Sequence, residues 1–240
     1  MLLSRLLQSQ GFGSRRECRA QVLSGQVGIN GQPSDNPDAD IPINDTLQIT
    51  VKGETLPYRA KAYLVLHKPA GYECSRQPLH HPSVFSLLPV PLIQRGVQCV
   101  GRLDQDTTGL LLFSDDGDFI HRTTSPKKLV GKVYAVTCKH PVDDDMIAAL
   151  TAGVQLHDEP APIAAQACVR LATHDLQLTI AEGKYHQAKR MIAAVGNRVE
   201  ALHRVAIGGY VLPQELSPGA WRWLSETDLA LLNLDQLEGR

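Results

Sequence analysis

The sequence predicts an α+β protein with a small amino-terminal module followed by a larger domain. Two helix patterns and then short strand patterns fill the first part, and strand and helix patterns alternate in the rest. A chain of 240 residues with 43% hydrophobic residues can form two modest cores. The segment Pro57–Ala60 has the composition of a linker. We therefore expect one domain over residues 1–57 and a second over residues 61–233.

The amino-terminal module begins with leucines at helical spacing, which predict a first helix. Ser14 and Glu17 form the pattern of a capping box, so a second helix is expected to open there and to run to Gly25. Asn30-Gly31 is a strong hairpin signal. Alternating apolar residues predict another strand over residues 47–51.

The central stretch of the chain is Gly101–Gly117, with the sequence GRLDQDTTGLLLFSDDG. Leu110–Phe113 is short and apolar, which is typical of a strand buried on both faces. Asp104 and Asp106 precede this strand, at a place where catalytic groups can be held rigidly. An aspartate here can equally cap a turn. The carboxylate spacing is near that of a calcium-binding loop, but the strand lies inside the supposed loop, and a two-carboxylate magnesium site lacks a third ligand.

Helix and strand patterns continue to the end of the chain. Asp118 is the expected cap of a short helix, and another helix is expected from Asp143 or Asp144 to Gly153. Apolar residues at positions i, i+3, i+4 and i+7 predict a helix that ends at Gly196. The expected strands are 63–66, 132–138, 164–171, 174–181, one that carries His203 and Arg204, and one from Trp221 that leads into a capped helix.

Charge and composition narrow the classes of protein. The net charge is −1, so affinity for nucleic acid must come from local patches. The five cysteines are scattered and form no CxxC pair, which argues against a disulfide framework or a zinc site and for a reducing cytosol. The start MLLSRLLQSQ lacks the apolar core of a signal peptide, and no stretch approaches the ~20 apolar residues of a membrane span. The expected location is the cytoplasm, with no membrane partner.

The segment GRLDQDTTGLLL resembles the signature of the pseudouridine synthases, and specifically of their RsuA-like branch. The resemblance covers nearly the whole chain and includes the segments HKPAG, KVY and GKYHQAKRM. It implies a catalytic domain with a mostly antiparallel, mixed central sheet flanked by helices. It also implies that Asp104 is the catalytic residue, and we assign a capping role to Asp106. Lys68–Gly71 is expected to form a rigid turn with a structural role.

Two further motifs carry site residues by the same resemblance. In this family the tyrosine of the K-x-Y element packs against the target uracil, so Tyr134 is the candidate stacking partner; core packing is the alternative. The basic residue of the HQxKRM motif pairs with the catalytic aspartate, which gives that role to Lys189. His186 and Arg190 share the helix stripe of Lys189 and are expected to bind substrate. A solvated basic face is the alternative.

The amino-terminal segment GFGSRREC…GQVGING is similar to the S4 RNA-binding domain. This similarity implies that arginines of the first two helices contact the RNA backbone. These arginines are Arg5, Arg15, Arg16 and Arg19. A solvated helix face is the alternative for a charge cluster of this size.

The implied reaction converts uridine to pseudouridine by breaking the N1–C1′ bond, turning the base and joining C5 to C1′. This chemistry requires no metal or redox cofactor, so no cofactor is expected. A close cation such as Lys189 favours the ionised form of Asp104. The target nucleotide must leave its stack. By the resemblance, Arg102 is the candidate that either inserts into the stack as a wedge or clamps the phosphate of the flipped nucleotide. A structural Arg102 that neutralises Asp106 or Asp115 is the competing role.

The HQxKRM form, together with GVQLHDE and the S4-like start, resembles the subgroup that modifies one uridine of small-subunit (16S) ribosomal RNA. Large-subunit (23S) enzymes of this branch usually carry NRQxRRM, so His186 discriminates between the two. The expected partner is 16S ribosomal RNA or a small-subunit assembly intermediate, and no protein partner is inferred. Two other classes stay open: a non-catalytic RNA-binding or ribosome-assembly protein, and a metal-dependent RNA phosphodiesterase that uses Asp104 and Asp106.

Overall fold

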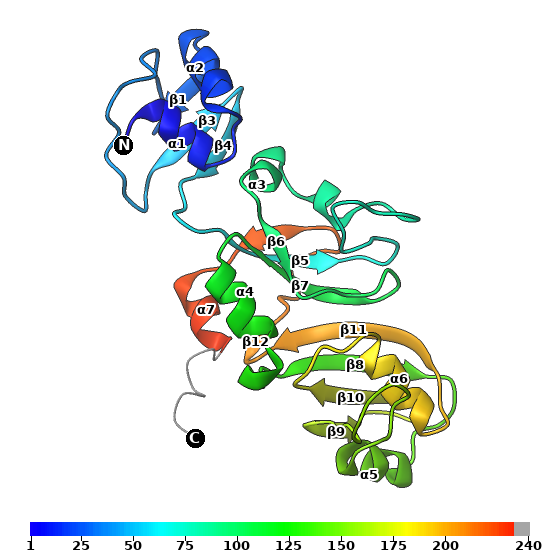
Figure 1. The fold of residues 1–240 in the computed structure, drawn as a ribbon. Helices are drawn as coiled ribbons and strands as arrows, with labels where there is room; N and C mark the ends of the chain where they lie inside the picture. The colour runs from blue at the N-terminus through cyan, green and yellow to red at the C-terminus, as the bar shows by residue number, and fades with distance from the viewer. Residues whose placement is uncertain (233–240) are drawn as a thin grey trace. The chain divides into compact units, whose positions relative to one another are not determined.

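The computed structural model describes residues 1–232, which form two compact units (Figure 1). The smaller unit consists of Met1–Ala62 and Leu88–Gln98. The larger unit consists of Tyr63–Leu87 and of the chain from Cys99 onward. The segment Leu88–Gln98, which the sequence assigned to the second domain, thus groups with the smaller unit. The expected end of that domain at residue 233 lies outside the described residues.

The smaller unit packs two helices against a four-stranded sheet. α1 (Leu3–Ser9) and α2 (Arg15–Leu23) form as predicted, and the capping box of Ser14 and Glu17 is present. The strand order is β2-β1-β3-β4. The strands are β1 (Val27–Ile29), β2 (Gln32–Pro33), β3 (Gln48–Val51) and β4 (Glu54–Pro57). No strand pattern predicted β4, which fills the end of the expected module.

The same unit contains a third helix, α3 (Val90–Gln94). Gly11 approaches it closely: its φ is +84°, and a side chain there would overlap the backbone carbonyl of Pro91. The side chain of Gln10 accepts a hydrogen bond from Arg95 Nη1 at 3.1 Å. These long-range contacts explain why residues 88–98 group with the amino-terminal module, and no local pattern could reveal them.

The larger unit is built on a nine-stranded sheet of order β13-β5-β7-β11-β8-β10-β9, in which β6 also pairs with β7 and β12 with β11. β7 and β11 run parallel, and the other neighbours along this order run antiparallel. This mixed, mostly antiparallel sheet confirms the predicted α+β class. The strands are β5 (Tyr63–Lys68), β6 (Gln98–Val100), β7 (Thr108–Ser114), β8 (Lys132–Cys138), β9 (Ala167–Arg170), β10 (Asp175–Ile180), β11 (Val199–Ile207), β12 (Tyr210–Val211) and β13 (Trp221–Trp223).

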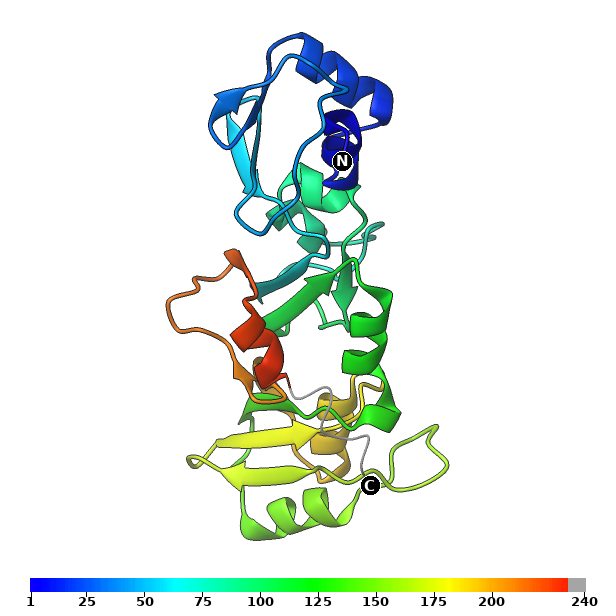
Figure 2. The same cartoon turned by 90° about the vertical axis from the view of Figure 1, so that its left-hand side faces the viewer.

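Helices flank this sheet: α4 packs against β7, α6 against β11 and α7 against β12, and Figure 2 shows α5 beside the β9–β10 hairpin. Their bounds are α4 (Gly117–Thr124), α5 (Asp144–Ala152), α6 (Gln187–Ala194) and α7 (Glu226–Leu231), with 3₁₀ turns η1 (Val84–Leu87) and η2 (Pro126–Lys128). The cap of α4 is Asp116, which accepts from the amides of Asp118 and Phe119. The prediction of Asp118 was wrong because Asp118 is already inside the helix, whereas the extended backbone of Asp116 lets its carboxylate turn back. No helix in this described chain is long and apolar enough to cross a bilayer.

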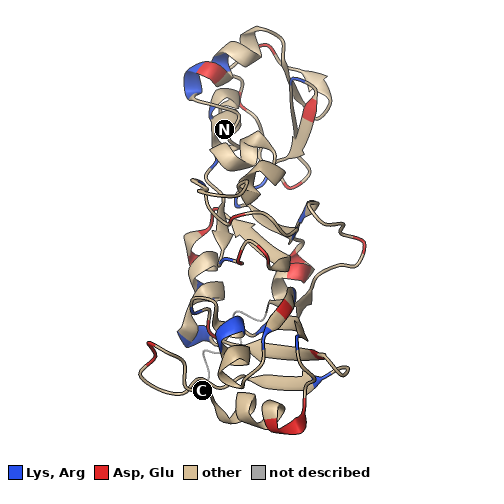
Figure 3. Ribbon diagram, turned by 90° about the vertical axis from the view of Figure 1, so that its right-hand side faces the viewer, with Lys and Arg blue, Asp and Glu red and all other residues tan. Residues whose placement is uncertain are grey.

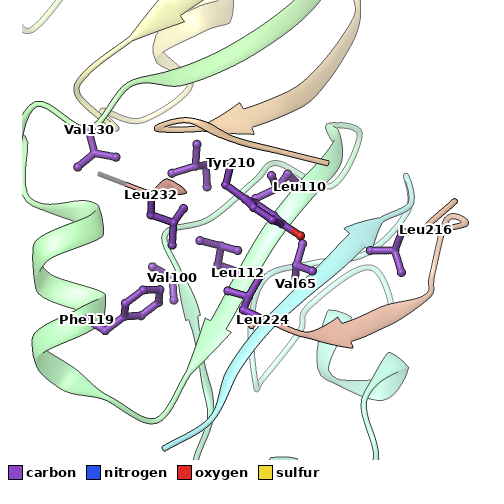
Figure 4. Packing of buried hydrophobic residues seen from close by; sticks show 11 residues of the cluster. Val65, Val100, Leu110, Leu112, Phe119, Val130, Tyr210, Leu216, Leu224 and Leu232 are labelled. Atoms are coloured by element: carbon purple, nitrogen blue, oxygen red, sulfur yellow. The ribbon is translucent and has the colours of Figure 1, made fainter. Parts of the chain in front are cut away.

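A core of the larger unit lies between β5, β7 and the helices α4 and α7 (Figure 4). Val65 and Leu112 belong to this core together with Phe119 of α4. Successive residues of a strand alternate between faces, so Phe113 turns to the other face of β7, where it meets Phe85 edge-on. β7 is therefore buried on both faces, as its apolar run predicted.

The central strands position the residues before β7. Gly109 lies opposite Arg204 in the parallel pair of β7 and β11. Its φ is +105°, and a side chain there would overlap the Arg204 backbone. On the other side of β11, Tyr134 of β8 lies opposite Arg204. Lys132 and Tyr134 are both on the buried side of β8. The end of β6, the start of β7 and the residues of β8 and β11 thus meet at one place in the fold.

Candidate active site

The loop between β6 and β7 carries Asp104. Lys68, the last residue of β5, fixes this loop, because its Nζ donates to the carbonyls of Gln105 and Thr107 at 3.1 and 2.8 Å. A third hydrogen bond, of 3.0 Å, goes to the carbonyl of Pro69. Lys68 is completely buried, and burial lowers its pKa from the ordinary value. The lysine of the HKPAG segment therefore clamps the part of the loop that directly follows Asp104.

The carboxylate of Asp104 meets two basic side chains near the start of α6. His186 Nε2 lies 3.1 Å from Oδ1, and Lys189 Nζ lies 3.2 Å from Oδ2. The Asp104 side chain is 27% exposed and that of Lys189 is 26% exposed. The structure thus brings Lys189 to Asp104, as the motif resemblance implied, and adds a contact from His186 that the sequence assigned to substrate instead.

Lys189 is shared with a second carboxylate, because its Nζ also donates to both oxygens of Asp106 at 2.6 and 2.9 Å. Burial lowers the pKa of Lys189, but hydrogen bonds and charges of the two aspartates outweigh it and raise the pKa overall. Partial burial raises the pKa of Asp106, but the hydrogen bond and charge of Lys189 outweigh it and hold that pKa below its usual range. Asp106 therefore binds a cation rather than capping a turn, since α6 brings Lys189 within its reach.

The packing of α6 determines where its basic side chains point. Met191 and Ile192 are fully buried, as the predicted apolar stripe requires, and Lys189 lies at the edge of that stripe. His186 precedes the helix with a φ of +49°, a conformation that is uncommon for a residue with a side chain. Its ring stacks on the exposed ring of Tyr185, with 3.8 Å between the centroids.

Arg190 lies away from Asp104. Its Nη1 donates to the carbonyl of Tyr185 at 3.3 Å, and its Nη2 donates to the carbonyl of His157. It also forms an ion pair of 3.7 Å with Glu159. Successive helical residues point about 100° apart, so the step from Lys189 to Arg190 turns the side chain toward the loop that contains His157. The structure does not bring this expected substrate-binding residue to the site.

A cavity of about 140 Å³ opens beside Asp104, between the loop before β7, α6 and the inner faces of β8 and β11. Its wall contains five of the residues that the sequence singled out: Arg102, Asp104, Tyr134, His186 and Lys189. Tyr134 is 8% exposed, so its ring is nearly covered by the protein. An ionisable carboxylate and an aromatic ring thus share one small cavity, which suits a flat polar ligand.

Arg102 is exposed and makes no hydrogen bond or ion pair within residues 1–232. It lines the small cavity and also a wider groove of about 860 Å³ that includes Asp106 and Tyr185. Arg102 therefore does not neutralise Asp106 or Asp115 in this structure, and the competing structural role is not observed. Within the described residues its guanidinium is unpaired, and Arg102 lies where the small cavity and the wider groove share a wall.

Two buried cations that the sequence reading did not assign to the site complete the cavity wall. Lys132 Nζ donates to the carbonyl of Ala181 at 3.0 Å. Arg204 Nε donates to the carbonyl of Leu110 at 2.7 Å, and its Nη1 donates to the hydroxyl of Tyr134 at 3.4 Å. Burial, with a smaller effect of the Arg204 charge, lowers the pKa of Lys132 to about 8.

The strand pattern contained a signal for one of these two cations. Lys132 is two residues before Tyr134, so both must point to the same face of a strand. Lysine is almost never fully buried unless it is paired, and a lysine on the apolar face of an alternating strand was therefore a candidate. Arg204 could not be placed in this way, because its surroundings depend on the pairing of β11 with β8, which shifts register between Arg204 and Ala206.

The arginines of the smaller unit differ in whether their side chains are already paired. Arg5, Arg15 and Arg16 are exposed and form no side-chain hydrogen bond or ion pair within the described part of the chain. Arg19 instead contacts both carboxylate oxygens of Asp38, at 2.5 and 2.9 Å. Figure 3 shows the basic residues on α2 in this unit and on α6 in the larger unit.

The site can therefore offer a carboxylate held by two basic side chains, a nearly buried aromatic ring, a free arginine and two buried cations. Such a set suits acid–base or nucleophilic chemistry on a flat polar ligand. Among residues 1–232, no group of three or more His, Cys, Asp and Glu side chains is placed to hold a metal ion.

Known proteins resemble this chain over most of its length. The model of a family described as RNA pseudouridylate synthase matches residues 62–194. An uncharacterized RNA pseudouridine synthase of Bacillus subtilis, YtzG, is 39% identical over 241 residues, which cover 98% of this chain and 100% of the relative. Ribosomal small subunit pseudouridine synthase A of Escherichia coli K12 is 38% identical over 231 residues, with 96% and 99% covered. A crystal structure of a pseudouridylate synthase aligns with a TM-score of 0.69 at 34% identity and covers 97% of this chain and 99% of the other.

Proposed function

Since the chain belongs to the RNA pseudouridylate synthase family, in its RsuA-like branch, we propose that it converts one uridine of small-subunit (16S) ribosomal RNA to pseudouridine. The relative from Escherichia coli is named for the small ribosomal subunit, and the match spans nearly all of both chains. His186 stands in the motif position that favours this subgroup. Large-subunit (23S) RNA is the alternative substrate, and the experiment below separates the two.

One observation carries the proposal: the carboxylate of Asp104, the ring of Tyr134 and the ammonium of Lys189 line the same small cavity. These three side chains come from a loop, a strand and a helix that are far apart in the sequence. The carboxylate must act on the ribose, and the aromatic ring must hold the base. The two groups must therefore be close enough to contact the same nucleoside. The cavity of about 140 Å³ suits a single base rather than a stretch of RNA.

In the proposed reaction Asp104 acts on the ribose of the target nucleotide. Its carboxylate can add to C1′ as a nucleophile or remove the proton from C2′ as a base. Either route releases the base from C1′ and lets it turn before C5 is joined to the sugar. Lys68 supports this role indirectly, because it fixes two residues that follow Asp104 in the loop and so helps to position the carboxylate.

Lys189 and His186 orient Asp104 in this proposal. Each carboxylate oxygen has its own basic neighbour, His186 for one and Lys189 for the other. The carboxylate is therefore held in one rotamer and is ready to react. We assign the pairing role to Lys189 and an orienting role to His186, in place of the direct substrate contact that the sequence predicted for His186.

The target base must be flipped out of its stack to reach Asp104. We assign the stacking surface for the base to Tyr134. Arg102 is unpaired within the described residues and lines the cavity. We propose that it binds the phosphate of the flipped nucleotide or fills the gap that this nucleotide leaves in the RNA stack. The exposed arginines of the smaller unit, Arg5, Arg15 and Arg16, are assigned to the RNA backbone. Arg19 is a weaker candidate there, because Asp38 already holds it.

The test is tritium release from 5-tritiated uridine in 16S and 23S ribosomal RNA, with a chelator present. Wild type is compared with Asp104→Asn and with Asp145→Asn, which changes an exposed carboxylate of α5. We expect wild type and Asp145→Asn to release tritium from 16S RNA at equal rates and Asp104→Asn to release none.

Each other outcome overturns one part of the proposal. Release only from 23S RNA keeps the isomerisation and rejects the target. Release by Asp104→Asn rejects the assignment of the carboxylate. If the wild type binds both RNAs, naked or in assembly intermediates, and releases tritium from none, the chain acts as an RNA-binding protein and the proposed reaction is rejected.

A further inference from the structure

Arg204 and Lys132 are buried cations for which the described residues offer no anion. Arg204 is 3% exposed and Lys132 is 7% exposed. Within residues 1–232 neither forms an ion pair with a carboxylate, and Nη2 of Arg204 has no hydrogen-bond partner. Among the described residues, the Lys132 ammonium has one hydrogen bond, to the carbonyl of Ala181. Both side chains line the cavity beside Asp104.

Two such cations weaken the free protein, because buried charges are ordinarily paired or coordinated. They also repel each other, and the charge of Arg204 helps to lower the pKa of Lys132. Groups that are unfavourable for folding and line a reaction cavity are typical of functional sites. The partner that these cations lack is therefore expected in the ligand.

The position of the two cations relative to Tyr134 indicates which part of the ligand they meet. Arg204 lies opposite Tyr134 on the neighbouring strand, with its Cζ 6.0 Å from the ring centroid. Lys132 is two residues before Tyr134 on the same buried face of β8. A base that rests on the Tyr134 ring therefore has both cations within reach of its edge, while Asp104 lies in the loop before β7.

We propose that the Arg204–Lys132 pair binds the carbonyl oxygens of the target uracil and stabilises the negative charge that the base carries once it is detached from the ribose. This inference rests on the proposed function and adds two catalytic residues to it. A uracil attached to ribose is neutral, so the full attraction develops only as the base departs. Interactions that strengthen toward the transition state raise the rate of the chemical step.

The charge in question follows from the bonds that change. When the N1–C1′ bond breaks, its electron pair leaves with N1, and the uracil anion shares one negative charge over N1, O2 and O4. C1′ gains in its place a bond to a carboxylate oxygen of Asp104, or a double bond to C2′ as Asp104 takes the proton from C2′. When C5 then bonds to C1′, that bond to Asp104 breaks, or the proton returns to C2′. The proton lost from C5 is balanced by the one gained at N1, so no other reactant is needed.

The test compares Arg204→Gln and Lys132→Met with two matched controls, Arg198→Gln and Lys139→Met. Arg198 precedes β11 and is 66% exposed, and Lys139 follows β8 and is exposed. The rate of the chemical step is measured in a single turnover with saturating enzyme, and the affinity for the same RNA is measured separately. Each enzyme is given RNA with uridine at the target and RNA with 5-fluorouridine there, and loss of the intact nucleoside is followed by digestion and mass spectrometry.

With uridine, we expect each site variant to react about 10²-fold more slowly than wild type, a loss typical of removing one charge-stabilising donor. RNA affinity and both controls should be unchanged. Fluorine at C5 withdraws electrons and stabilises the uracil anion by itself. The defect of the site variants should therefore shrink by about tenfold with 5-fluorouridine, which a merely structural role would not cause.

Wild-type rates in both site variants would overturn the inference, and so would an equal defect with the two nucleosides. If Arg204→Gln does not fold, Lys132→Met decides between the same outcomes, since methionine fills most of the space of the lysine without its charge. A wild type that loses neither nucleoside would reject the proposed function itself. The two failures are thus distinguishable in one experiment.

Discussion

The ammonium of Lys189 donates to both carboxylate oxygens of Asp106, at 2.6 and 2.9 Å. It lies farther from Asp104, at 3.2 Å, although Asp106 is twice as exposed, at 55% against 27%. The outer carboxylate thus holds the cation in place, while the inner one faces the cavity and keeps its other oxygen against His186. Two aspartates two residues apart therefore have different surroundings and, we infer, different roles.

Asp104→Asn and Asp106→Asn remove the same charge from the same cation, and we expect very different effects on kcat. Loss of Asp104 should lower kcat by roughly 10³-fold or more, as for a group that takes part in bond breaking. Loss of the exposed Asp106 removes an ion pair worth about 1 kcal/mol or less, so kcat should fall by at most about tenfold. Tritium release at saturating RNA measures both. Equal losses would mean that the two carboxylates act as one unit.

The predictable parts of this fold depend on local contacts. The capping box of Ser14 and Glu17 and the one at Ser225 and Asp228 each join residues three apart, so the sequence contains everything that forms them. The Asn30-Gly31 turn is equally local, and both residues have a positive φ. The cap of α4 was assigned to Asp118 instead of Asp116, because the choice depends on a backbone angle that composition does not determine.

The candidate site was predictable only where a motif named its residues. Asp104, Tyr134 and Lys189 were identified by resemblance to a family, and the structure brings them to one cavity. Arg204 was overlooked because its role depends on the register between two strands that are far apart in sequence. Arg190 was assigned to the site because it was placed on the same helix stripe as Lys189, but the geometry of the helix turns it toward another loop.

Lys68→Met is expected to lower both stability and activity. The variant leaves the carbonyls of Gln105 and Thr107 without their hydrogen bonds in a fully buried place. Broken hydrogen bonds to a buried charge should lower the free energy of unfolding of the larger unit by about 2–4 kcal/mol. Both tryptophans of the chain, Trp221 and Trp223, lie in this unit, so their fluorescence reports its unfolding. Exposed Lys139→Met is the control, and equal stability of the two variants would refute the clamp.

Arg15→Gln combined with Arg16→Gln is expected to weaken RNA binding mainly at low salt. Each phosphate contact of a single strand contributes about 0.7 to the slope of log affinity against log salt concentration. Two lost contacts should therefore make the slope shallower by about 1.4. Arg19→Gln should change it less, because Asp38 already competes for that guanidinium. Titration of labelled RNA at several salt concentrations measures the slopes. An unchanged slope in the double variant would remove α2 from the RNA-binding surface.

Lys132→Met should change how stability depends on pH. The pKa of Lys132 is lowered to about 8 in the folded protein from its ordinary value of 10.5, chiefly by burial. The unfolded chain therefore binds more protons than the folded one between these two pH values, so wild-type stability rises with pH through this window. The unfavourable effect of the buried charge is fully present below pH 8 and is lost by pH 10.5. The free energy of unfolding of wild type, relative to Lys132→Met, should rise by about 2 kcal/mol from about pH 7 to 9.5.

Tryptophan fluorescence during chemical unfolding at several pH values provides this measurement, with Lys139→Met as the control for an exposed lysine. At neutral pH the methionine variant should unfold at a higher denaturant concentration than wild type while it reacts more slowly with RNA. A gain in stability together with a loss of rate is typical of a charged group that serves catalysis rather than folding. Parallel pH curves for wild type and Lys132→Met would mean that the pKa of Lys132 is the same in the folded and the unfolded protein, so that burial does not disfavour its charge. The charge of Lys132 would then not weaken the free protein, and the argument that the ligand supplies a missing anion would rest on Arg204 alone.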